Sequence, residues 1–250
     1  MNLRKKRRRS TSATIYIPIA ALLVLLLTIY GSSAFLKIIN IEVIGSTRYS
    51  RAEIVAATGI TVGDNMILVD TLGAKVRVYT ELPFISVVEI TRSMPDTILI
   101  EVRESEPIAF VGYKNGAAMI DSSGKVLYFS DNAPPGLIEI RGVRPTDAVA
   151  GSIIKAGTEN ETKLSYMIQV LAAIDKAEIK KDVTYLDITS IANIGIDYKE
   201  RRVLLGGPED VQKKLDELPA KMDEIIGTYP DDKQGVFDMS RKPWRWAPDR

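Results

Sequence analysis

The feature that most constrains this chain is the run of residues 15–36, which carries no charged side chain over 22 positions. A helix of that length, at about 1.5 Å per residue, spans the roughly 30 Å hydrocarbon core of a bilayer. Six basic residues occupy positions 4–9, and such a flank stays on the cytoplasmic side of a membrane. The sequence therefore predicts a basic cytoplasmic tail at residues 1–14, one transmembrane helix at 15–36 and a C-terminal body outside the cytoplasm.

An alternative interpretation of this segment is a cleavable signal peptide. The small residues at 32–34 resemble a cleavage site. The uncharged run is longer than the apolar core of a signal peptide, which is about 7 to 15 residues, so a retained anchor is favoured. Nucleic-acid binding by the basic tail is a further alternative, but a basic flank beside a membrane helix already serves to orient that helix.

Composition argues against most enzyme classes. The 250 residues include no histidine and no cysteine, which excludes thiolate and imidazole metal ligands, disulfide bonds and every Ser-His or Cys-His catalytic pair. The acidic residues show no metal-ligand spacing, and most alternate with apolar residues on predicted strands, as on a solvated sheet face. We therefore expect no enzyme activity, no cofactor, no metal and no small-molecule substrate.

Two short motifs nevertheless resemble an acyl-transfer site. Residues 122–125 read as S-x-x-K and residues 130–132 as S-D-N, both signatures of penicillin-binding enzymes. Here they fall in predicted turns only a few residues apart, and the sequence has no K-T-G, so we interpret them as turn chemistry and expect alanine at Ser122 or Lys125 to leave function unchanged. A cell-wall acyl-transfer enzyme or hydrolase remains the alternative, because Ser-Lys or paired carboxylates can act without histidine.

The pattern after residue 36 predicts the order strand, helix, helix, strand, strand. Ser50 and Glu53 form a capping box that begins the first helix. Gly59 is placed to end this helix, and the second helix cannot continue past Pro83. The strands of this region are expected at residues 37–44, 85–92 and 97–103.

The remaining chain is predicted to consist of short strands and two amphipathic helices. An Asn-Gly pair at 115–116 marks a hairpin, and a second capping box, Thr158 with Glu161, opens a helix that reaches residue 176. A last helix starts at Pro208, with a kink or a break expected at Pro219. Strands are expected at residues 109–111, 118–120, 126–129, 185–188, 194–198, 203–205 and 235–240, and the tail 241–250 is expected to be irregular.

A series of short sequence features follows the predicted anchor in a fixed order. They are Ile41-Glu42-Val43-x-Gly45, Ser50 with Glu53-Ile54, Gly59-Ile60-x-x-Gly63-x-Asn65, Val69-Asp70, Pro83-Phe84-Ile85, Arg92-x-x-Pro95-x-Thr97, Ile100-x-Val102-x-Glu104, Pro107-x-Ala109 and Ile120-Asp121-x-x-Gly124-x-Val126-Leu127. In this order, directly after a basic-flanked membrane helix, they resemble the FtsQ/DivIB family of bacterial cell-division proteins. The C-terminal half resembles the β domain of that family more loosely.

The resemblance implies an α+β fold, with a POTRA domain at residues 37–106, an antiparallel β domain with two packed helices at 107–240 and a tail at 241–250. It implies a non-catalytic scaffold of the bacterial cytoplasmic membrane, concentrated at the division septum. The implied partners are FtsL-like and FtsB/DivIC-like proteins and the septal peptidoglycan synthase complex. A POTRA-containing transport component is the alternative, although it would need barrel strands where two amphipathic helices are predicted here.

By the same resemblance, the last predicted strand is where partners of the FtsB/DivIC kind engage. The candidates for partner binding are Val236, Phe237, Asp238, Met239, Trp244 and Trp246. Strand alternation puts Phe237 and Met239 on the inward face. A free edge would offer unpaired N–H and C=O groups to a partner strand. The sequence leaves open whether this strand is free, and whether the two tryptophans belong to the core or to an interface.

Overall fold

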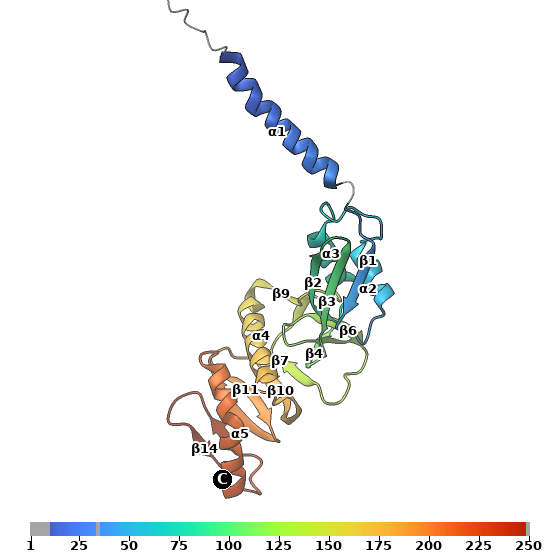
Figure 1. Cartoon of the computed structure of the whole chain (residues 1–250). Coiled ribbons are helices and arrows are strands. Elements are labelled where there is room, and N and C mark those ends of the chain that lie inside the picture. Colours follow the sequence, from blue (N-terminus) through green and yellow to red (C-terminus); the bar gives the residue numbers. More distant parts are fainter. Residues whose placement is uncertain (1–10, 34–35, 249–250) are drawn as a thin grey trace, which may run out of the picture. The chain divides into compact units, whose positions relative to one another are not determined.

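The computed structural model of the chain describes residues 11–33 and 36–248. It shows two compact units (Figure 1). The first comprises the described residues up to Lys75 together with Val88–Val102, and the second comprises Val76–Val87 and the described residues from Arg103 onward.

Helix α1, Thr11–Ser33, contains Pro18 and overlaps the predicted membrane segment at 15–36. The basic cluster at positions 4–9 and residues 34–35 lie outside the described residues. Among the residues that are described, no helix is both long and apolar enough to cross a membrane.

The predicted order of strand, helix, helix, strand, strand is confirmed after residue 36. The described strands of this region form a sheet in the order β1-β3-β2, in which β1 and β3 are parallel. Side chains of Ile54, Met66 and Ile98 are fully buried and form part of the core of the first unit. The elements are β1 Asn40–Ile44, α2 Arg51–Thr58, α3 Thr71–Glu81, β2 Ile85–Ser93 and β3 Thr97–Glu104.

The ends of α2 follow from the sequence as expected. The Ser50 hydroxyl accepts a hydrogen bond from the Glu53 amide, and the Glu53 carboxylate accepts one from the Ser50 amide at 2.8 Å. The Glu53 carboxylate also accepts a hydrogen bond from the Ser50 hydroxyl at 2.6 Å, and this bond, together with the bond from the Ser50 amide, lowers the pKa of the Glu53 carboxyl. Gly59 ends the helix with a φ of 65°, a left-handed conformation that costs glycine little.

The second unit is built on one large sheet. Within the described residues it has nine strands, in the order β14-β13-β12-β11-β10-β7-β4-β5-β6, and a separate pair, β8-β9. The strands are β4 Ala109–Tyr113, β5 Gly116–Ile120, β6 Val126–Ser130, β7 Ile138–Arg141, β8 Pro145–Asp147, β9 Lys155–Ala156, β10 Val183–Asp187, β11 Ile194–Tyr198, β12 Arg201–Gly206, β13 Val236–Asp238 and β14 Arg245–Ala247.

Two helices, α4 Glu161–Lys176 and α5 Val211–Thr228, lie against this sheet (Figure 1). Short 3-10 turns at Thr158–Asn160 and Lys180–Asp182 flank α4. Buried side chains from both helices join those of the strands in a single apolar core. The mixture of helices and sheet confirms the expected α+β class.

The prediction of an antiparallel β domain is wrong in part, because the sheet is mixed. Strand β7 is parallel to both β4 and β10, and β12 is parallel to β13. Helix α4 returns the chain to the starting end of the sheet between β7 and β10, and α5 does the same between β12 and β13, so the strands before and after each helix run in the same direction. Strand β7 is parallel to β4 because the chain between β6 and β7 crosses back through the loop at residues 131–137.

Three local predictions also need correction. The capping box at Thr158 does not form, because Thr158 lies inside a 3-10 turn and α4 begins only at Glu161. Helix α5 begins at Val211 instead of Pro208 and continues through Pro219 as one helix. The buried side chains of Leu215, Leu218 and Met222 lie on both sides of that proline, and their packing on the sheet holds the helix together there.

Candidate partner-binding edge

Strand β13 lies between two other strands near one end of the large sheet. It is parallel to β12, with Phe237 opposite Val203, and antiparallel to β14, with Phe237 opposite Trp246. In the described part of the chain, β14 is the terminal strand of the sheet and pairs on one side only. The open edge is therefore β14, which lies in the tail that was expected to be irregular.

The side chains of β13 alternate as the sequence predicts. Phe237 and Met239 are buried, whereas Val236 and Asp238 are half-buried. The Met239 amide donates to the Leu204 carbonyl at 2.8 Å, which extends the contact with β12. Phe237 and Met239 are therefore core residues, and their side chains do not face a partner at this edge.

The two tryptophans are partly buried and pack on the margin of the core. The ring of Trp244 meets Phe237 edge to face at 6.5 Å between centroids, and the ring of Trp246 stacks on Tyr229 at 6.3 Å. Both arrangements are favourable aromatic geometries. Each tryptophan thus attaches the tail to the second unit and also leaves part of its ring accessible.

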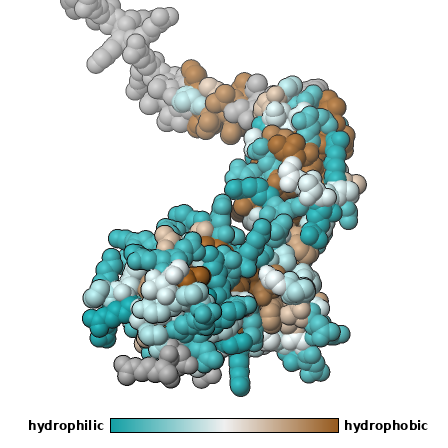
Figure 2. Space-filling model, turned by 90° about the horizontal axis from the view of Figure 1, so that it is seen from below, coloured by the Kyte–Doolittle hydropathy of each residue, from teal (hydrophilic) through white to brown (hydrophobic). Residues whose placement is uncertain are grey.

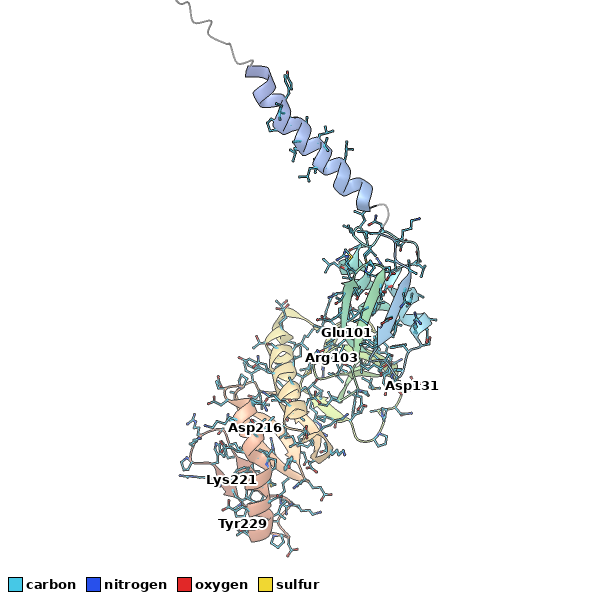
Figure 3. All side chains as sticks on the ribbon, in the orientation of Figure 1. Glu101, Arg103, Asp131, Asp216, Lys221 and Tyr229 are labelled. Carbon is cyan, nitrogen blue, oxygen red and sulfur yellow. The ribbon has the colours of Figure 1, made fainter. Side chains whose placement is uncertain are left out.

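A groove of about 420 Å³ runs between α5 and this tail. Its lining combines aromatic rings with charges of both signs from α5, including Glu217 and Lys221. Figure 3 shows Lys221 on α5 and Tyr229 just past the end of that helix. The lining also includes Phe237, Trp244, Trp246 and Lys242. Aromatic residues are enriched at protein-protein interfaces, which also contain polar and charged residues.

Comparison with known proteins shows which family the chain belongs to. A family model described as "POTRA domain, FtsQ-type" matches residues 36–105. The cell division protein FtsQ of Corynebacterium glutamicum is 30% identical over 169 residues, which cover 64% of this chain and 75% of that protein. The chain belongs to the FtsQ/DivIB family. The cell division proteins DivIB of Clostridium tetani and Clostridium botulinum are 23% and 25% identical and cover 88% and 96% of this chain, and 82% and 91% of their own lengths.

Membership of the FtsQ/DivIB family assigns this chain a role in cell division and a POTRA domain in its N-terminal part. The relatives are named as cell division proteins, not as enzymes of the cell wall. In the described ranges no three acidic side chains gather in a way that could hold a metal ion.

The segment that leads from α5 into β13 is held by Arg201, a residue that the sequence patterns did not single out. Arg201 is 4% exposed, and its guanidinium donates to the carbonyls of Pro230 at 3.0 Å and Asp232 at 3.1 Å. Longer bonds of 3.4 Å reach the carbonyls of Tyr229 and Lys199. Arg201 thus fixes the segment between α5 and β13. The one signal in the sequence is an arginine at the start of an apolar strand.

The indole ring of Trp246 packs against the same segment between α5 and β13. A side chain at Gly235 would collide with the indole ring of Trp246, so only glycine fits at this position. The Gly235 amide donates to the Asp232 carboxylate at 2.8 Å. The other Asp232 oxygen and the Trp246 indole N–H are buried and lack a hydrogen-bond partner among the described atoms.

The S-x-x-K motif of this FtsQ/DivIB-type chain lies in a turn, as predicted. The Asp121 carboxylate accepts from the amides of Ser123 at 2.9 Å and Lys125 at 3.0 Å, and also from the Ser123 hydroxyl. The Lys125 ammonium is buried, donates to the Ile85 carbonyl and lies 5.8 Å from the centre of the Tyr79 ring. Burial lowers the pKa of the Lys125 ammonium, and the Asp121 carboxylate partly opposes this change.

Lys125 therefore has a structural role that the turn motif did not reveal. We expect Lys125→Ala to lower the free energy of unfolding by about 1 to 3 kcal/mol, because it leaves the buried Ile85 carbonyl unpaired. Ser122→Ala should change it by less than about 0.5 kcal/mol. Chemical denaturation of both variants measures the difference. Equal stability of the two variants would contradict the structural role of Lys125.

Proposed function

We propose that this FtsQ/DivIB-family chain is a membrane-anchored, non-catalytic division scaffold that captures a partner strand at β14. The partners are FtsL-like and FtsB/DivIC-like single-pass proteins, and the assembly helps to control the septal peptidoglycan synthase complex. The observation that carries the proposal is the open edge of β14 beside an aromatic groove.

The backbone of β14 supports strand addition. An edge strand exposes unpaired N–H and C=O groups that can bond to an incoming extended segment. The side chains of Arg245 and Ala247 are exposed, so they do not cover this edge. Of the candidates from sequence, Trp244 and Trp246 are the side chains that a partner reaches, whereas residues 236–239 support them from the adjacent strand.

The groove supports specificity at the same edge. Tryptophan and tyrosine are the residues most enriched among those that dominate binding energy at protein interfaces. A partner whose strand pairs with β14 could place a following apolar segment on Trp244, Trp246 and Tyr229. Backbone pairing would thus supply affinity, while the groove would select the partner.

The support for the proposed membrane anchor comes from the sequence. Residues 15–36 carry no charge, and the basic cluster at positions 4–9 stands on the N-terminal side. This asymmetry orients the N-terminus toward the cytoplasm and the two units toward the outside. A location at the cytoplasmic membrane, concentrated at the septum, is consistent with the cell-division names of the relatives.

A proline test examines the proposed edge. Arg245→Pro and Ala247→Pro each remove one backbone N–H from β14 without removing a buried side chain. Both variants should co-purify at least about tenfold less FtsB/DivIC-like partner from membranes than the parent, because proline removes the edge donor or breaks the ladder to β13. Arg245→Ala and Ala247→Ser keep the N–H and should retain full capture.

Thermal melts of the proline variants show whether the removed N–H points inward, toward β13, or outward, toward the open edge. A variant that melts like the parent and loses its partner identifies an outward N–H. Full capture by both proline variants would exclude β14 as the docking edge. Increased capture would instead indicate that the partner displaces β14 and pairs with β13.

A further inference from the structure

Large apolar side chains are exposed at one end of the first unit, next to the point where the chain enters it. Five of them, between 44% and 70% exposed, are Ile39, Val62, Ile67, Leu68 and Met94. Hydrogen bonds show that their segments meet. The Ile38 amide donates to the Asp64 carbonyl at 2.9 Å and the Ile39 amide to the Asp96 carbonyl at 2.8 Å. Figure 2, which is seen from below, shows a different face of the molecule, on which most of the surface is hydrophilic.

The loop that presents these side chains is held in place by specific bonds. The Asn65 side-chain oxygen accepts from the amides of Ile67 at 2.9 Å and Leu68 at 3.1 Å. The Arg92 guanidinium donates to the carbonyls of Met66 and Val69, both at 2.8 Å, and the Met66 side chain is fully buried. Ile67 and Leu68 are thus fixed in an exposed position, which lowers the entropy cost of binding a ligand there.

Chain connectivity indicates what covers this surface. The Met66 amide donates to the Leu36 carbonyl at 2.8 Å, and Leu36 follows Ser33, the last residue of α1, by three positions. Three residues span at most roughly 11 Å. If residues 15–36 are the membrane anchor, as proposed above, the exposed apolar loop lies at the outer surface of the bilayer.

The charges around the loop define the kind of membrane contact. The segments that meet at this loop carry Lys37 and Arg92 as well as Asp64, Asp70 and Asp96, so the two signs nearly balance. Attraction to anionic headgroups requires an excess of basic residues, which this surface does not have. Exposed leucine and isoleucine side chains instead favour the boundary between headgroups and acyl chains.

We propose that Val62, Ile67 and Leu68 insert into the outer interface of the bilayer beside the anchor, and so fix the orientation of the first unit on the membrane. The inference rests on the proposed anchor at residues 15–36. The occupant is the acyl-chain boundary of the bilayer, without preference for anionic lipid.

The chain contains no cysteine, so a single introduced cysteine can carry an environment-sensitive fluorophore. The full chain with Leu68→Cys is labelled and reconstituted in phosphatidylcholine vesicles that contain spin-labelled lipid. Glu101→Cys is the matched control: Glu101 is exposed on β3 (Figure 3) and lies four residues, about 13 Å, from the start of that strand. We expect quenching at residue 68 to exceed that at residue 101 at least threefold.

A second variant tests the apolar contact itself. Leu68→Asp changes an exposed residue, so its melting temperature should match that of the parent. With the fluorophore at Val62→Cys, it should reduce lipid quenching at least twofold. Unchanged quenching would overturn the inference, and so would a dependence on phosphatidylglycerol that exceeds about twofold.

Flotation separates the two proposals. A chain that floats with the vesicles but shows equal quenching at residues 68 and 101 retains its anchor and overturns only the insertion. A chain that does not float overturns the anchor and the insertion together. If the residue 68 fluorophore is shielded only after the single-pass partners are added, a protein covers this surface and the lipid inference is wrong.

Discussion

Arg201→Ala is expected to lower the free energy of unfolding of the second unit by about 3 to 5 kcal/mol, because the guanidinium is buried and a hydrogen bond from a charged donor contributes about 1.5 to 3 kcal/mol. The change removes the hydrogen bonds that the guanidinium donates to the carbonyls of Pro230 and Asp232. Both tryptophans of the chain lie in the tail beside this segment, so denaturant titration followed by tryptophan fluorescence reports on the affected edge directly.

Arg201→Lys is the matched control. Lysine keeps the charge but cannot reach carbonyls in several directions with a planar fork, so we expect it to recover less than half of the lost stability. Partner capture should fall with Arg201→Ala, because the segment before β13 is no longer fixed. If Arg201→Ala has the same free energy of unfolding as the parent, the guanidinium does not hold this segment.

Trp246→Ala should weaken capture of the FtsB/DivIC-like partner by about 10- to 100-fold, since a tryptophan at the centre of an interface contributes about 2 kcal/mol or more. The variant removes the ring that stacks on Tyr229 and closes over Gly235. Pull-down of the partner at graded concentrations, together with thermal melts, measures the loss of binding and any loss of stability.

Two controls test whether the loss of capture is specific to the Trp246 ring and to the β14 edge. Trp246→Phe keeps an aromatic ring on Tyr229 and deletes the indole N–H that lacks a partner among the described atoms, so capture should stay within about threefold of the parent. Phe129→Ala removes a 46% exposed aromatic residue from β6, the strand at the other end of the sheet, and should leave capture unchanged. Equal losses at Trp246 and Phe129 would argue against a specific site at β14.

Local rules predicted the elements whose ends are set by neighbouring residues. The capping box at Ser50 and the left-handed Gly59 define α2 because each bond joins residues a few positions apart. The alternation that buries Phe237 and Met239 is equally local. The turn at Asp121 likewise follows from a short run of polar residues.

Pairing between distant segments could not be predicted in this way. The parallel pairing of β7 with β10 and of β12 with β13 depends on where α4 and α5 pack. The tail that contains β14 is held by contacts of Trp246 with Tyr229 and of Trp244 with Phe237, which are distant in the sequence. The role of Arg201 depends on carbonyls about 30 positions along the chain. The sequence by itself therefore determined the family, the order of helices and strands between residues 37 and 104 and the inward residues of the last predicted strand. Only the tertiary structure decided which strand is the edge, because that depends on long-range contacts that no local pattern encodes.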